Sequence, residues 1–209
     1  MHERVLPQGS RELLEIFEGL TDPELDGWTL AGGTGLALQV GHRISEDFHF
    51  FRLEPFDVGR LYGVLREAGP TETLQEDRDT LTVLLEGVKL SFFSLADPFL
   101  FDARGYRFFE VADVRDIALM KLAAISSRGS RKDFVDLYTI LRGGLSLERC
   151  FEWLPRKYGE GRVNSYHVLK SLTYFEDAER EPMPRMLEPL DWEECKAFFT
   201  REAHAIVLP

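Results

Sequence analysis

The stretch from Trp28 to Phe51, WTLAGGTGLALQVGHRISEDFHFF, constrains the fold more than any other part of the sequence. An apolar run meets Gly-Gly-Thr, a short apolar run with helical spacing follows, and a second apolar run carries Asp47. This order predicts a strand over residues 28–31, a glycine turn, a helix over 34–40 and a strand over 47–52. Glycines at a helix start leave backbone N–H groups open, which is where phosphates bind. Asp47 is therefore a candidate ligand for a divalent cation beside such phosphates.

The remaining pattern changes from mixed to helical near residue 111. Before it, helical spacing predicts helices over residues 11–20 and 58–68, and apolar runs predict strands over 80–85, 88–95 and 106–111. After it, helices are predicted from Asp113, from Ser130 to the Gly143-Gly144 stop, and over residues 147–154, 165–174 and 192–205, with a Pro-rich surface connector at 181–189. The sequence thus predicts an α/β core over residues 1–111 and a helical region over 112–209 packed on it.

Net charge, cysteine count and the lengths of the apolar runs limit the classes of protein to which this chain can belong. The formal net charge of −11 argues against charge-driven nucleic-acid binding over the whole surface, although a local basic patch stays open. Two cysteines in 209 residues allow one disulfide but fit a reducing compartment better. The N-terminus is polar, without an apolar signal core, and the apolar runs are too short to span a membrane. We expect a cytoplasmic protein with no membrane partner.

With these motifs in place, the chain resembles the AbiEii/AbiGii toxin family of nucleotidyltransferase-like proteins. The resemblance rests on four segments in the expected order: LAGGTGLALQVGHRISEDFHFF, GVKLSFF, DVRDIALMKLAAISSRGSRKDFVDLYTIL and LTYFEDAEREPMPRMLEPLDWEECKAFF. It implies an α+β fold, a nucleotidyltransferase-like mixed sheet with flanking helices followed by a helical C-terminal part. It also implies Mg²⁺-dependent transfer of a nucleotide from a nucleoside triphosphate (NTP) to an acceptor. Some members are toxins of toxin–antitoxin pairs, and some modify tRNA ends.

The resemblance assigns the triphosphate to Gly32, Gly33 and Thr34, and the cation to Asp47. The family places a second acid two residues further on, where this chain has His49. Because alternate residues of a strand face the same way, Asp47 and His49 are predicted to hold the same ion. Imidazole is a poor ligand for Mg²⁺ but acceptable for Mn²⁺ or Zn²⁺, so the expected cofactor is Mg²⁺ or Mn²⁺. The third acid, expected on a later strand, is replaced by Ser91.

The helical segment after residue 113 supplies further candidates. By resemblance, Lys121, Arg128 and Lys132 neutralise phosphate charge, Arg128 as a nucleotide-binding residue. Asp133 or Asp136 then orients a lysine or acts as a base. The simpler alternative is an ion pair within one helical turn, between Lys132 and Asp136.

Two function classes remain open from the sequence. The first is a nucleotidyltransferase with an NTP substrate, a tRNA or protein acceptor, and a cognate antitoxin. The second is a catalytically degenerate member of the same fold that binds a nucleotide or a protein. His49 and Ser91 favour the second, whereas the retained glycines and Asp47 favour ligand binding in either case. The simpler explanations are a turn that needs glycine for steric reasons alone and an Asp47 paired with Arg43 or Arg52.

Overall fold

A computed structural model describes residues 1–208. The chain divides into two compact units. The first contains Met1–Pro98 and Asp102–Asp113, and the second contains Phe99–Phe101 and the chain from Val114 onward. The chain therefore passes between the units three times, because the short segment Phe99–Phe101 belongs to the second unit.

The first unit is built on a seven-stranded mixed sheet with the order β3-β4-β5-β2-β1-β7-β6. β2 and β5 pair in parallel, as do β1 and β7, and the remaining neighbours are antiparallel. The strands are β1 (Thr29–Ala31), β2 (Phe48–Arg52), β3 (Thr71–Asp77), β4 (Thr80–Leu85), β5 (Val88–Ser94), β6 (Arg104–Tyr106) and β7 (Phe109–Val111). The mixed sheet with flanking helices that we expected is confirmed.

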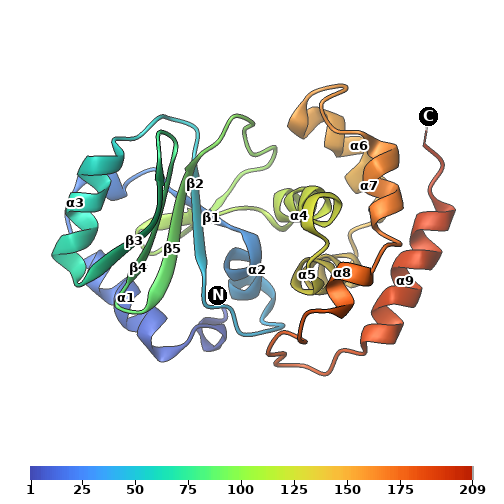
Figure 1. Cartoon of the computed structure of the whole chain (residues 1–209), viewed down its shortest axis with the longest axis horizontal. Helices are drawn as coiled ribbons and strands as arrows, with labels where there is room; N and C mark the ends of the chain where they lie inside the picture. Colours follow the sequence, from blue (N-terminus) through green and yellow to red (C-terminus); the bar gives the residue numbers. More distant parts are fainter. Residues whose placement is uncertain (209) are drawn as a thin grey trace. The chain divides into compact units, whose positions relative to one another are not determined.

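One face of this sheet carries an aromatic core. Phe50 of β2 stacks on Phe92 of β5 with ring centroids 5.2 Å apart, and Trp28 meets Phe92 edge-on at 5.0 Å. Figure 1 shows α1 (Gln8–Glu18) and α3 (Val58–Ala68) on this side of the sheet and α2 (Gly32–Val40) on the other. Two short 3₁₀ helices, η1 (Glu3–Val5) and η2 (Pro23–Leu25), complete the unit. Burying Phe48 and Phe50 on one face leaves residues 47, 49 and 51 on the opposite face.

Two expectations for this unit need correction. Residues 106–111 were expected as one strand, but they form part of a hairpin, because Arg107 adopts a left-handed conformation with φ +54° and separates β6 from β7. Arg107 is held there by ion pairs with Glu3 at 2.9 Å and Glu18 at 3.0 Å, which lie 104 and 89 residues earlier in the sequence. In addition, β3 was not predicted. It is an edge strand exposed along nearly its whole length, so no apolar alternation marks it.

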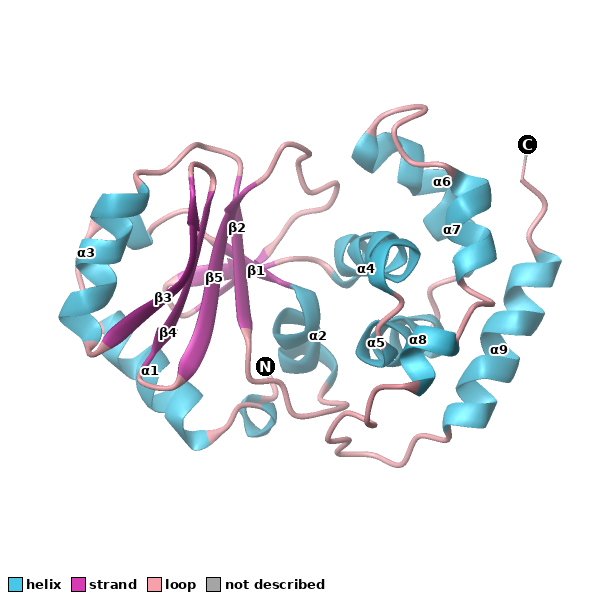
Figure 2. Cartoon of the chain, viewed as in Figure 1, coloured by secondary structure: helices cyan, strands magenta, loops and turns pink. Residues whose placement is uncertain are grey.

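The second unit is helical (Figure 2). Its helices are α4 (Val114–Arg128), α5 (Arg131–Arg142), α6 (Leu147–Tyr158), α7 (Ser165–Ser171), α8 (Glu176–Glu179) and α9 (Trp192–Ala205). Side chains cap several of them at the N-terminus, as Ser146 does for α6 and Asp191 for α9. Among residues 1–208, no helix is both long enough and apolar enough to cross a bilayer. The expected helical C-terminal part is thus confirmed, although the predicted helix over 165–174 ends at Ser171.

Polar and aromatic contacts fasten the end of the chain to α5. The Glu181 carboxylate accepts hydrogen bonds from the N–H of Arg131 at 2.9 Å and the hydroxyl of Ser130 at 2.6 Å. Phe134 of α5 meets Phe199 of α9 edge-on, with centroids 5.4 Å apart. Glu181 therefore caps α5 from the Pro-rich connector, and a carboxylate at a helix N-terminus is favoured by the helix dipole.

Candidate active-site clusters

The glycine turn and the second strand meet closely in the first unit. Gly32 begins α2 with φ +68°, a conformation that L side chains rarely adopt. A Cβ at this position would lie only 3.2 Å from Nδ1 of His49. Ala31 and His49 are paired across β1 and β2, which explains the approach. Glycine is therefore required at position 32 by both backbone conformation and space, and His49 lies beside the first turn of α2.

The N-terminus of α2 has no side-chain cap, since the preceding residue is Ala31. Helix N-termini carry N–H groups without intrahelical partners, and the helix dipole adds a partial positive charge. Gly33 and Thr34 lie in this first turn. Uncapped first turns of this kind are where proteins generally bind phosphates and other anions.

Asp47 lies immediately before β2 and is half-buried. Its main-chain carbonyl accepts a hydrogen bond from the hydroxyl of Thr34. Within residues 1–208, no hydrogen bond or ion pair joins its carboxylate to another group. Arg52, one of the partners considered from the sequence, instead pairs with Glu24 at 3.4 Å. A half-buried carboxylate without a protein partner suits a cation ligand.

The donor set fits one divalent cation better than two. Asp47 supplies one carboxylate, and His49 supplies an imidazole from the same strand face. Mg²⁺ and Mn²⁺ at phosphate sites are commonly held by one or two carboxylates together with substrate phosphates. Ser91 is in register with His49 on β5, and its hydroxyl accepts a hydrogen bond of 3.1 Å from Thr82. A neutral hydroxyl pair thus occupies the third acid position, and the charge for a second cation is missing.

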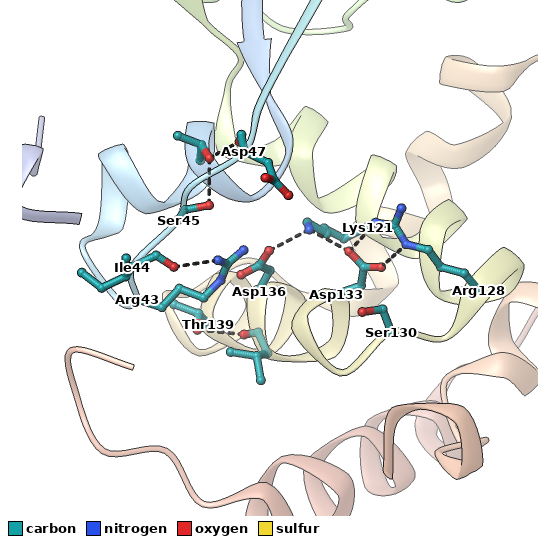
Figure 3. A network of polar contacts seen from close by, with 12 residues as sticks. Arg43, Ile44, Ser45, Asp47, Lys121, Arg128, Ser130, Asp133, Asp136 and Thr139 are labelled. Atoms are coloured by element: carbon teal, nitrogen blue, oxygen red, sulfur yellow. Dashed lines mark hydrogen bonds and ion pairs between the residues drawn. The ribbon is translucent and has the colours of Figure 1, made fainter. Parts of the chain in front are cut away.

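The second unit contains a buried cluster of alternating charges (Figure 3). Nζ of Lys121, on α4, lies 2.7 Å from a carboxylate oxygen of Asp133 and 2.7 Å from one of Asp136, both on α5. The Arg128 guanidinium donates to both oxygens of Asp133, at 2.7 and 3.0 Å. Both aspartate side chains are fully buried, whereas the Arg128 side chain is 55% exposed. The two aspartates therefore orient Lys121 from inside the unit, and Arg128 extends from the cluster toward solvent.

These cations determine the protonation state of Asp133. Burial alone would raise the pKa of its carboxyl group, but the Lys121 ammonium and the Arg128 guanidinium outweigh burial and hold the pKa below its ordinary value. Asp133 also raises the pKa of Arg128 by accepting its hydrogen bonds. Asp133 is therefore ionised at neutral pH.

Lys132 lies apart from this cluster. It is exposed on α5, and the residues described here give it no ion pair or hydrogen bond. The simpler alternative, a Lys132–Asp136 pair within α5, is not formed, because Asp136 binds Lys121 instead.

The sequence did not reveal a second buried ion pair. Nζ of Lys157, on α6, lies 2.9 Å from Asp116 of α4, and Asp116 also accepts the backbone N–H groups of Leu100 and Phe101 at 2.9–3.0 Å. These contacts attach the segment Phe99–Phe101 to the helical unit. The only sequence signal was an acid in the first turn of a predicted helix, which normally indicates an exposed residue.

Both cysteines are buried and free, as Cys150 on α6 and Cys195 on α9. Burial raises the pKa of each thiol to about 12. Both side chains contribute to packing, since neither is exposed to solvent. Within the described part of the chain, no three His, Cys, Asp or Glu side chains converge as a metal-binding group.

The fold resembles solved nucleotidyltransferase structures. MenT4, a nucleotidyltransferase toxin from Mycobacterium tuberculosis H37Rv, superposes with a TM-score of 0.57 at 14% identity, over 93% of this chain and 80% of that one. A structure described as a putative nucleotidyltransferase from H. pylori gives a TM-score of 0.54 at 15% identity, over 98% of this chain and 92% of that one. The first unit and the helical unit together define a nucleotidyltransferase-like fold.

The sequence comparisons identify the family. The pattern of the family described as nucleotidyl transferase AbiEii toxin, Type IV TA system, matches residues 80–206, which is more than half of the chain. The chain belongs to this family, and the resemblance inferred from its motifs is confirmed. An uncharacterized protein from Aquifex aeolicus (strain VF5) is 37% identical over 204 residues, covering 95% of this chain and 96% of the relative.

Proposed function

We propose that this protein transfers a nucleotide from an NTP to an acceptor, with one divalent cation held by Asp47 and His49. The observation that carries the proposal is the position of Asp47. Its carboxylate has no protein partner among the described residues and directly precedes β2, whose His49 lies beside the glycine turn of α2. A metal–triphosphate complex needs backbone N–H groups for its phosphates and a carboxylate for its cation, and this unit contains both.

The reaction is a displacement at the α-phosphorus of the NTP. An acceptor oxygen forms a bond to phosphorus, the bond to the bridging oxygen of the pyrophosphate breaks, and the acceptor proton passes to a base. The cation neutralises phosphate charge when bound. The first-turn N–H groups of Gly33 and Thr34 bind phosphate oxygens, and Gly32 permits the backbone to turn there. Asp47 and His49 orient the cation.

In the second unit, we assign Lys121 and Arg128 to phosphate charge and Asp133 and Asp136 to holding them. Lys121 is nearly fully buried between two carboxylates, so its ammonium has a fixed direction. Arg128 is fixed at Asp133 yet more than half exposed, which leaves guanidinium N–H groups for an anion. Lys132 is exposed and contributes charge without fixed geometry.

The cofactor, the acceptor, the partner and the location are further parts of this proposal. We propose Mn²⁺ over Mg²⁺ as the better cofactor, because one of the two ligands is an imidazole. The proposed acceptor is tRNA or a protein, the proposed partner is a cognate antitoxin, and the proposed location is the cytoplasm. The two free, buried cysteines agree with a reducing compartment.

The test is incubation with each α-labelled NTP, total RNA or a protein extract, and Mn²⁺ or Mg²⁺. We expect label in one acceptor fraction, more with Mn²⁺ than with Mg²⁺, and none with Asp47→Asn. Lys121→Met should also abolish labelling, whereas Glu152→Gln, an exposed change on α6, should not alter it. Equal labelling by wild type and Asp47→Asn would contradict the assignment of Asp47.

The alternative is a member that binds a nucleotide or a protein without catalysis. The buried Thr82–Ser91 hydrogen bond favours it, because that pair occupies the position where the family has an acid. In this case calorimetry would detect NTP binding that depends on Asp47, while no acceptor would be labelled.

A further inference from the structure

Two hydroxyl groups join the first turn of α2 to the segment leading into β2. Oγ1 of Thr34 donates to the main-chain carbonyl of Asp47 and lies 2.8 Å from Oγ of Ser45. A hydroxyl has one hydrogen to donate. Because Thr34 gives its hydrogen to Asp47, Ser45 must be the donor in the second bond. The three residues therefore form a directed chain of hydrogen bonds, from Ser45 to Thr34 to Asp47.

Both hydroxyl groups of this chain are shielded from water. Thr34 is 1% exposed and Ser45 is 7% exposed. The N–H of Ser45 donates to the carbonyl of Val5, on η1, at 3.0 Å. The chain of bonds is thus anchored at its far end by a second element, and solvent cannot easily replace its members. A buried polar group that loses its partner is costly, so these bonds persist in the folded state.

We propose that Thr34 and Ser45 are positioning residues that fix the Asp47 carboxylate relative to the phosphate-binding turn. The proposal rests on the function proposed above, in which Asp47 holds the cation. The bond to the Asp47 carbonyl fixes the peptide plane at the start of β2, and this plane sets the direction of the Asp47 side chain. Because Thr34 itself belongs to α2, the turn that receives phosphate and the carboxylate that receives the cation form one rigid piece.

This geometry also narrows the role proposed for Thr34. The resemblance assigned Thr34 to the triphosphate, and the single hydrogen of its hydroxyl is given to the main-chain carbonyl of Asp47. Only the backbone N–H of Thr34 is then assigned to phosphate. The hydroxyl acts on the cation indirectly, through the main chain of Asp47.

The experiment measures Mn²⁺ binding to the full-length protein, by the electron paramagnetic resonance signal of free Mn²⁺, beside the melting temperature of each variant. We expect Thr34→Val to weaken Mn²⁺ binding roughly tenfold or more, the usual effect of removing an outer-shell partner. Thr34→Ser keeps the hydroxyl and should bind Mn²⁺ close to wild type. Ser45→Ala should weaken binding to a smaller extent, because Thr34 keeps its own bond to Asp47.

Thr71→Val is the matched control. Its hydroxyl donates to the main-chain carbonyl of Gly69 at 2.9 Å, in the same unit but at the start of the edge strand β3. It should lower the melting temperature and leave Mn²⁺ binding unchanged, which separates lost stability from lost positioning. If Thr34→Val does not fold, Ser45→Ala and Thr34→Ser decide the question.

Two results would overturn the inference, and they differ from each other. Wild-type Mn²⁺ binding by Thr34→Val, or by Ser45→Ala where the first variant does not fold, would refute the positioning role while Asp47→Asn still abolishes binding. Undiminished Mn²⁺ binding by Asp47→Asn would instead refute the cation site of the proposed function, and the positioning role would fail with it.

Discussion

Asp133→Asn tests whether the buried charge cluster of the helical unit stabilises the fold. Removing one member of a buried ion pair costs about 3–5 kcal/mol, because the remaining charge is left without compensation. Here the loss is smaller, since Lys121 keeps Asp136 at 2.7 Å. The Arg128 side chain is 55% exposed, so solvent screening reduces its share to about 0–1 kcal/mol. We expect Asp133→Asn to lower the free energy of unfolding by about 2–3 kcal/mol.

Thermal unfolding by circular dichroism measures this loss. For a chain of this size, about 2–3 kcal/mol corresponds to roughly 4–12 °C in melting temperature. The exposed pair of Arg149 and Glu152, 3.0 Å apart on α6, is the matched control. Glu152→Gln should change stability by no more than about 0.5 kcal/mol. In a double-mutant cycle, Lys121→Met and Asp133→Asn should deviate from additivity by about 1 kcal/mol or more.

The pH dependence gives an independent check with a defined sign. The pKa of Asp133 is lower in the folded than in the unfolded state, so its contribution to stability is complete above the unfolded pKa. That contribution is lost as the pH falls through the folded pKa. The difference between wild type and Asp133→Asn should therefore be constant near neutral pH and narrow in acid. A difference below about 0.5 kcal/mol at pH 7, or one that grows in acid, would refute the reasoning.

Three further predictions concern single positions. Gly32→Ala should lower the free energy of unfolding by about 1–3 kcal/mol in urea titrations, because φ is +68° and the new Cβ would lie 3.2 Å from His49. Gly63→Ala is the control: this exposed glycine of α3 has nothing within 4 Å of the new Cβ, so the change should not destabilise the protein. His49→Asp should lower the melting temperature in chelator and recover part of it in Mg²⁺, since two adjacent carboxylates repel without a cation; equal melting curves would count against a cation site. The thiols of Cys150 and Cys195, whose pKa burial raises to about 12, should resist a thiol reagent at pH 8 in the native state and react in denaturant.

Local patterns were sufficient for most of the fold. α3 and α9 begin and end at the residues predicted for them, and the strands predicted over residues 80–85 and 88–95 form the β4–β5 hairpin, which turns at Glu86-Gly87. These patterns lie within the helix or strand that they predict, or within a few residues of it. By contrast, β3 buries neither face and so carries no period, and the turn at Arg107 depends on two distant glutamates.

The contacts within the candidate site clusters were harder to predict from the sequence, because they join residues that are distant along the chain. The motif around Asp47 and the family resemblance for Lys121 and Asp133 named these residues as candidates, but their bonding partners follow from packing. Lys132 and Asp136 had the ideal helical spacing for an ion pair, yet Asp136 binds Lys121, fifteen residues earlier, because α4 and α5 lie side by side. Coulomb attraction is stronger between buried charges than between exposed ones, and only the fold determines which residues are buried.

The hydrogen-bond partners of the Thr34 hydroxyl also follow from the fold and could not be predicted from the sequence. The resemblance assigned Thr34 to the triphosphate without distinguishing its backbone N–H from its hydroxyl. Its neighbours Ser45 and Asp47 lie eleven and thirteen residues further on, across α2 and a loop. Because buried hydroxyl groups are hydrogen-bonded within the protein, the Thr34 hydroxyl donates to the nearby Asp47 carbonyl and not to a ligand. Variation at position 34 should therefore affect the cation, through Asp47, more than it affects the phosphate.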